Sequence, residues 1–227
     1  MTEGEGKGPQ RVSGLEVDLH IHTHRSPDSM SRPEKVINRA SRADLGAIAV
    51  TDHDTWEGYL EAKRIAPESL LIIPGSELKT DRGDLIVLFV EEVKSRYWPE
   101  VIDEVRSAGG ITIVPHPFES KRLSQQDIAL ADAMEVFNAN CGRASNADAL
   151  ALAQRLGKPG FASSDAHVVC AVGNGRTLVP SSSTVEELRC NLLKNPVVSR
   201  HETTNPVLHY ANAGLCLGLK GVWKNRL

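Results

Sequence analysis

The chain has 227 residues, a length at which one α/β domain can bury a substantial core without disulfides or a structural metal. Hydrophobic residues make up 41% of the chain and aromatic residues only 4%, so the core must be built mainly from Ala, Val, Ile and Leu. The formal net charge of -3 gives no broadly basic surface of the kind that is typical of nucleic-acid-binding proteins.

The two ends of the chain differ in composition from the middle. Residues 1–14, rich in Gly, Glu and Lys, are expected to be a disordered leader, and residues 15–195 are expected to form one domain. Residues 196–227 are predicted to be a strap or helix that packs on this domain, with a dimer contact as the alternative. The apolar stretch 206–223 contains His209, Asn212 and Lys220 and therefore does not resemble a membrane span.

The number and spacing of the cysteines indicate in which cellular compartment the protein is found. The chain has four of them, widely spaced and without a CxxC pair: Cys141, Cys170, Cys190 and Cys216. Together with the lack of a signal peptide, this spacing predicts a protein of the reducing cytoplasm.

Apolar runs alternate with helical patterns along the chain. Strands are predicted at residues 15–22, 46–50, 70–74, 85–90, 111–114, 133–137 and 159–163. Between them, helices are predicted at 31–45 with Ser31 as N-cap, 59–66, 99–108 and 144–156, and a last helix at 184–194 with Ser183 as N-cap. About seven strands with intervening helices indicate a parallel sheet.

A closed barrel is favoured over an open sheet. Polar residues follow nearly every strand, whereas an open doubly wound sheet would gather its ligands at one switch point. No Gly-rich dinucleotide or P-loop fingerprint is present. The sequence therefore predicts an α/β fold, a distorted (βα)7 TIM-like barrel in a single domain.

The polar residues at the strand ends are of the types that commonly bind metal ions in proteins. His20 and His22 lie two apart on a strand and so point to the same face, and Asp165 and His167 repeat this spacing. Candidate ligands lie at the ends of five predicted strands or in the loop after the first strand. They are His20, His22, Asp28, His53, Glu77, His116, Asp165 and His167. Nitrogen and oxygen donors of this kind suit Zn²⁺, Mn²⁺ or Fe²⁺.

Each candidate also has a simpler explanation. A lone His-x-His pair arises often by chance, Asp28 would suit a turn, and His53 would suit a helix-capping loop, in which Asp52 or Asp54 orients its ring. The joint placement of all of them at strand ends favours a multinuclear metal hydrolase.

The chain resembles a known family in six motifs that occur in family order between residues 15 and 178. These motifs read DLHIHTHRSPDS, AVTDHDT, IPGSELKT, VPHPF, MEVFN and SSDAH. They are similar to those of the PHP (polymerase and histidinol phosphatase) superfamily. The resemblance implies a distorted seven-stranded barrel, two or three divalent metal ions (Mn, Fe or Zn) and phosphoesterase chemistry.

The resemblance also implies three metal positions. The first would be held by His20, His22, Glu77 and Asp165, the second by Glu77 and His116, and the third by Asp28, His53 and His167. Two departures leave the second position open. Many members have a His where this chain has Asp84, and a His or Cys where it has Asn138, Asn140 and Cys141. Whether Cys141, Asn138 or Asp84 replaces the missing ligands is not fixed by the sequence.

The expected reaction is attack by a metal-activated hydroxide on a phosphate ester. Asp28, His53 or His167 would assist proton transfer, and Lys79, Arg143 and His24 are candidates to bind the substrate phosphate. The short chain has no inserted specificity domain, which favours a small phosphomonoester, a nucleotide or a short oligonucleotide over a long nucleic acid. Two alternatives are a non-catalytic metal-binding module and an amidohydrolase-like C–N hydrolase, for which Lys79 would be a poorly placed bridging lysine. The oligomeric state stays open.

Overall fold

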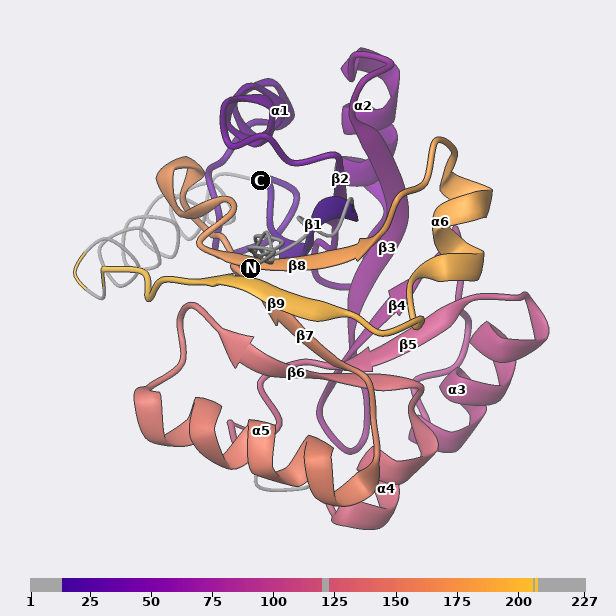
Figure 1. Cartoon of the computed structure of the whole chain (residues 1–227). Coiled ribbons are helices and arrows are strands. Elements are labelled where there is room, and N and C mark those ends of the chain that lie inside the picture. Colours follow the sequence, from indigo (N-terminus) through magenta and orange to yellow (C-terminus); the bar gives the residue numbers. More distant parts are fainter. Residues whose placement is uncertain (1–13, 120–122, 206, 208–227) are drawn as a thin grey trace, which may run out of the picture.

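The computed structural model describes residues 14–119, 123–205 and 207. Within them, nine strands form one mixed sheet in the order β7-β6-β5-β4-β3-β2-β1-β8-β9, which curls into a nearly closed barrel (Figure 1). The strands are β1 (Gly14–Ile21), β2 (Ala47–Val50), β3 (Leu71–Lys79), β4 (Asp84–Leu88), β5 (Ile111–Val114), β6 (Ala133–Asn138), β7 (Gly160–Ser163), β8 (Gly175–Pro180) and β9 (Val197–His201). The predicted distorted TIM-like barrel is confirmed.

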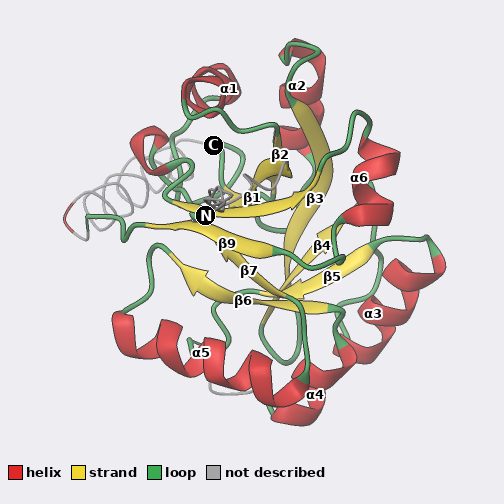
Figure 2. Ribbon diagram, in the orientation of Figure 1, coloured by secondary structure: helices red, strands yellow, loops and turns green. Residues whose placement is uncertain are grey.

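Helices surround the sheet on the outside, as Figure 2 shows. They are α1 (Pro33–Arg42), α2 (Glu57–Ile65), α3 (Trp98–Ser107), α4 (Gln125–Leu130), α5 (Arg143–Leu156) and α6 (Val185–Asn191), with a short 3₁₀ helix at Val169–Ala171. None of the helices described is long and apolar enough to cross a membrane.

Aliphatic side chains form the core, as the composition predicts. One buried cluster joins inward-facing residues of several strands, among them Leu19, Ala49, Ile73 and Ile113. A second cluster packs α1 and α2 against β1 to β3, and a third packs α3, α4 and α5 against β4 to β6. Buried packing on both faces explains why these strands read as continuous apolar runs.

The prediction of an all-parallel sheet of about seven strands is wrong. β4 runs antiparallel to β3 and to β5, and β8 runs antiparallel to β1 and to β9. The connection from Lys79 to Asp84 is too short for the crossover that a parallel pair requires. The prediction also omitted β8 and β9, because their burial alternates along the strand instead of forming a continuous apolar run.

Both predicted N-caps are wrong. Arg32 is the N-cap residue of α1 and makes no side-chain cap, while the hydroxyl of Ser31 donates to the His167 carbonyl (3.2 Å). Thr184 caps α6, since its Oγ1 accepts from the Glu187 backbone N–H (3.1 Å). Ser31 therefore ties the loop after β1 to the loop after β7, which positions the site described below.

The predictions for the two ends of the chain fall mainly on residues that the structure does not describe. The leader, except for Gly14, lies outside the described part of the chain, as do residue 206 and residues 208–227. Of the predicted C-terminal strap, β9 is described, and it extends the sheet beside β8.

Candidate metal centre

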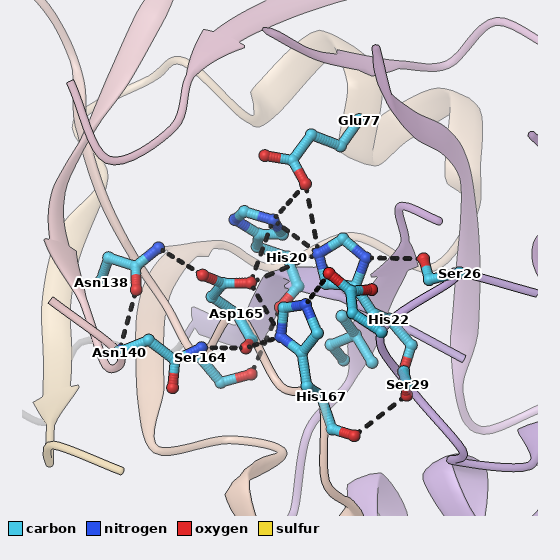
Figure 3. Close-up of polar contacts among 12 residues, drawn as sticks. His20, His22, Ser26, Ser29, Glu77, Asn138, Asn140, Ser164, Asp165 and His167 are labelled. Carbon is cyan, nitrogen blue, oxygen red and sulfur yellow. Dashed lines mark hydrogen bonds and ion pairs between the residues drawn. The ribbon is translucent and has the colours of Figure 1, made fainter. Parts of the chain in front are cut away.

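The eight candidate ligands converge at one end of the barrel. His20 and His22 come from the end of β1, Glu77 from β3, and the others from the loops after β1, β2, β5 and β7. Six of the eight line a cavity of about 400 Å³, together with Asp84, Glu119, Asn140, Cys141 and Gly142. His20 and His22 are fully buried beside it. Figure 3 shows His20, His22, Glu77, Asp165 and His167 pointing toward one another.

Four ligand atoms lie close enough to one another for neighbouring ligands of one cation. Nε2 of His20 lies 3.0 Å from Nε2 of His22, 3.2 Å from Oε2 of Glu77 and 3.4 Å from Oδ1 of Asp165. Nε2 of His22 lies 3.3 Å from each of the same two oxygens. Tetrahedral ligands at bond lengths of about 2.0–2.1 Å would be about 3.3–3.4 Å apart. The five distances are therefore close to those between ligands of one cation.

Glu77 faces two groups of ligands at once. Its Oε2 points to His20 and His22, while its Oε1 lies 3.0 Å from Nε2 of His116. The two oxygens of a carboxylate can each bind a different cation. Glu77 is thus placed to bridge two metal positions.

A further group lies on the other side of His22. Oδ2 of Asp28 is 3.3 Å from Nε2 of His53 and 3.2 Å from Nε2 of His167. One ligand atom from each of these residues and from His22 falls within 4.8 Å of the others. The His, Asp and Glu clusters together suit a multinuclear metal site.

The electrostatics of the cluster favour ionised carboxylates. Burial disfavours ionisation of Glu77, but His20, His116 and His22 outweigh it and hold the pKa of Glu77 well below its usual value. Burial likewise opposes a charge on His116, yet the hydrogen bond and charge of Glu77 raise the pKa of His116 to about 9. Metal ligands of this kind bind in deprotonated form, so cations would displace protons here.

Two ligand residues have strained backbones. His116 (φ 26°) and Asp165 (φ 47°) both adopt positive φ, which residues other than Gly rarely do. Such strain persists where the surrounding structure enforces it, typically at functional sites. Pro115 and Pro117 on either side of His116 restrict that loop further.

Glu135 is a supporting residue that the sequence prediction missed. Its Oε1 lies 2.9 Å from Nδ1 of His20, and its Oε2 accepts from the His116 backbone N–H (2.9 Å) and from the Asn138 amide (2.9 Å). The carboxylate therefore orients one ligand and fixes the loop of another. The sequence signal that could have revealed it is an acidic residue inside the apolar run of β6. In the structure, Glu135 is 99% buried.

The prediction that Asp52 or Asp54 orients the ring of His53 is wrong. Asp52 accepts from the hydroxyls of Thr23 (2.6 Å) and Ser26 (2.9 Å), and Asp54 accepts from the Lys79 backbone N–H and from Arg96. Ser26 in turn lies 2.9 Å from Nδ1 of His22. Asp52 thus supports the ring of His22 through Ser26, whose Oγ also accepts from the His53 backbone N–H (3.0 Å), and it makes no hydrogen bond to the ring of His53 among those described.

The three candidate phosphate-binding residues do not line the cavity. Lys79 is exposed on the β3–β4 hairpin, and Nε2 of His24 lies 3.7 Å from Glu61. Arg143 lines a separate hollow of about 810 Å³ beside α5 and β9, with Phe137 and His201. Of the described residues that line the metal-site cavity, five are acidic and none is Lys or Arg.

The sequence matches known families in two segments. Residues 18–102 match the PHP domain, and residues 143–195 match the PHP-associated family. An uncharacterized protein of Methanocaldococcus jannaschii is 34% identical over 141 residues, which are 55% of this chain and 82% of that protein. The 5'-3' exoribonuclease Rnm of Escherichia coli is 29% identical over 146 residues, 63% of this chain but only 43% of Rnm.

A solved structure shares the fold. It is a two-domain protein from Bacteroides vulgatus described as containing a PHP-like metal-dependent phosphoesterase. The TM-score is 0.69 at 18% identity, with 83% of this chain and 65% of the other covered. The sequence matches and the shared barrel, with the ligand cluster at its end, lead to one conclusion: this chain belongs to the PHP domain family.

Proposed function

We propose that the chain hydrolyses the phosphate ester of a small phosphomonoester, a nucleotide or a short oligonucleotide. The observation that carries this proposal is the convergence of His20, His22, Glu77 and Asp165 beside an open cavity. The similarity to Rnm, a 5'-3' exoribonuclease, supports phosphate-ester chemistry. Mn²⁺, Fe²⁺ or Zn²⁺ would suit these donors.

The charge of the cavity determines how a phosphate would bind. The described residues of its lining include five acids and no Lys or Arg, and these acids would repel an anionic substrate in the absence of cations. Bound divalent cations would neutralise the phosphate oxygens and lower the pKa of a water molecule. Phosphate binding by this protein would therefore depend on metal rather than on Lys79, Arg143 or His24.

Side chains that line the cavity can hold a proton and transfer it. His167 and His53 both contact Oδ2 of Asp28, and all three line the cavity. A proton held within this group can be passed to the leaving oxygen of the substrate. Asn140 donates to the Asp165 carbonyl (2.5 Å) and fixes the strained loop that carries Asp165 and His167.

The test is phosphate release by purified protein supplied with Mn²⁺ or Zn²⁺. The substrates are p-nitrophenyl phosphate, nucleoside monophosphates, nucleoside 3',5'-bisphosphates, histidinol phosphate and 5'-phosphorylated RNA of two to five nucleotides. His20→Ala should lower turnover at least about 100-fold, because it removes a ligand of the tightest cluster. His201→Ala, on β9 and outside the cavity, is the matched control and should retain full activity.

The outcomes separate the candidate functions. Release of nucleotides from RNA without release from monoesters would identify an exonuclease of short RNA. No turnover on any substrate with metal bound would overturn the proposal in favour of a non-catalytic metal-binding module. An amidohydrolase-like reaction is disfavoured, because no Lys of the described residues lines the cavity.

A further inference from the structure

β7, the strand that precedes Asp165 and His167, lies at an edge of the described sheet. It forms a hydrogen-bonded ladder with β6, while the described residues join it to β1 only through an isolated bridge between Ile21 and Ala166, just past β7. The two segments nevertheless meet at the metal centre, where Oδ1 of Asp165 lies 3.4 Å from Nε2 of His20 (Figure 3). With so short a ladder, this distance depends on other contacts between the segments.

The carboxylate of Asp18 on β1 makes such contacts at both ends of the loop after β7. Its Oδ1 accepts from the backbone N–H of Ser164 (3.0 Å), and its Oδ2 accepts from the backbone N–H of Gly173 (2.8 Å). Asp18 is fully buried, so these hydrogen bonds take the place of the water that a carboxylate would otherwise require. One side chain of β1 thus holds both ends of the loop that carries Asp165 and His167.

Asp18 is close to the ligands on both sides of this contact. It precedes His20 by two residues on β1, and Ser164 directly precedes Asp165, whose φ is 47°. The hydroxyl of Ser164 also donates to the His20 carbonyl (3.3 Å). The paths from Asp18 to the two ligands are short, so a shift of Ser164 would be passed on to Asp165.

We propose that Asp18 is a positioning residue of the metal centre, which holds the loop after β7 so that Asp165 and His167 face the histidines of β1. This inference rests on the proposed metal centre. The Asp18 carboxylate bonds to backbone N–H groups and lies in none of the close ligand groups among the described residues. Residues that support metal ligands commonly change metal affinity about 10–100-fold when they are replaced. Asp18 acts through the backbone, so its effect should lie at the lower end of this range.

The test is the affinity of the metal-free, full-length protein for Zn²⁺, measured by competition with a fluorescent chelator. Asp18→Asn keeps the shape of the side chain but has one accepting oxygen, so it loses one of the two backbone hydrogen bonds. Its affinity should fall about tenfold. Asp132→Asn is the matched control, because Asp132 also accepts from a backbone N–H, that of Thr112 (2.9 Å), and lies outside the cavity. Glu119→Gln, which removes an acid from the cavity wall, is the second control, and both should bind Zn²⁺ as the wild type does.

A double-mutant cycle separates positioning from a general loss of stability. The background is Asp165→Asn with His167→Ala, which removes both ligands of the loop, and Asn tolerates the positive φ at position 165. In this background, Asp18→Asn should change the Zn²⁺ affinity no further. An equal tenfold loss in both backgrounds would overturn the inference, as would wild-type affinity in Asp18→Asn alone.

A second variant covers the case in which Asp18→Asn does not fold, which urea unfolding of the metal-free protein would show. Gly173→Ala strains the other donor of the Asp18 hydrogen bonds, because φ is 80° there and a Cβ would lie 3.0 Å from Nε of Arg176. Its Zn²⁺ affinity should also fall, and wild-type affinity in a folded Gly173→Ala would overturn the inference. Failure of the proposed reaction would leave these affinities unchanged and would appear only as missing phosphate release.

Discussion

Each buried histidine of the first metal position has its ring fixed by a specific partner. Nδ1 of His20 faces Glu135, and Nδ1 of His22 faces Ser26, which leaves both Nε2 atoms directed at Glu77 and Asp165. Such partners set the orientation and tautomer of a ligand before any metal arrives. At this scale, we expect metal affinity to depend also on residues that do not touch the metal.

Glu135→Gln should weaken metal binding at the first position about 10–100-fold. The amide has one accepting oxygen in place of two, so it cannot serve the His20 ring, the His116 backbone and Asn138 together. Competition with a fluorescent chelator measures the affinity, and Glu119→Gln again serves as the control. Wild-type affinity in Glu135→Gln would show that His20 needs no such partner.

At the scale of the elements, the site depends on how closely α2 approaches the loop after β1. Gly58 of α2 lies against Asp52 and Thr23: a Cβ at this position would be 1.9 Å from Asp52 Oδ2 and 2.5 Å from Thr23 Oγ1. These two atoms form a buried hydrogen bond with each other, and the other carboxylate oxygen of Asp52, Oδ1, accepts from Ser26 beside His22. The missing side chain of Gly58 is therefore part of what positions the first metal site.

Gly58→Ala should destabilise the metal-free protein by about 1–3 kcal/mol. The sign is opposite to helix propensity, which favours Ala over Gly by about 1 kcal/mol in a helix interior. Urea unfolding measures the change, and Arg64→Ala on the exposed face of α2 should stay within about 0.5 kcal/mol of wild type. Stabilisation by Gly58→Ala would mean that Asp52 and Thr23 move aside at no cost.

At the scale of the whole molecule, the metal centre joins strands that are distant in sequence. Its ligands come from β1 and β3 and from the loops after β1, β2, β5 and β7, so bound cations would cross-link both halves of the barrel. Without cations, the buried carboxylates depend on protonated histidines for charge balance. Metal binding and folding stability should therefore be linked.

Removal of metal by a chelator should lower the unfolding midpoint by roughly 8–16 °C. A ligand at about a thousand times its Kd stabilises a protein by about 4 kcal/mol, and each kcal/mol shifts the midpoint by about 2–4 °C in a domain of this size. Differential scanning calorimetry with and without chelator measures the shift. His20→Ala is the control: its midpoint should respond much less to the chelator, and an equal response would place the stabilising metal elsewhere.

The sequence predicted the barrel, and it predicted the candidate ligands for the same physical reason. Strands buried on both faces must be apolar along their length, so the polar residues that end them stand out, as His53 does after β2 and His116 after β5. Strand directions were not predictable in this way. The hairpin between Lys79 and Asp84 and the alternating β8 and β9 made the sheet mixed, and only the pairing of the strands shows it.

The sequence by itself determined which residue types could bind metal and at which end of the strands they lie, because hydrophobic periodicity and chain order are local properties. Only the tertiary structure decided which of them meet and what supports them. Glu135 lies 115 positions from His20 in sequence, and their contact exists only because β6 and β1 face the same barrel interior. Asp84 reached the cavity through the register of β3 with β4, and Lys79, Arg143 and His24 remained outside it. Register and packing are long-range properties, and they assembled the centre from residues that the sequence alone leaves far apart.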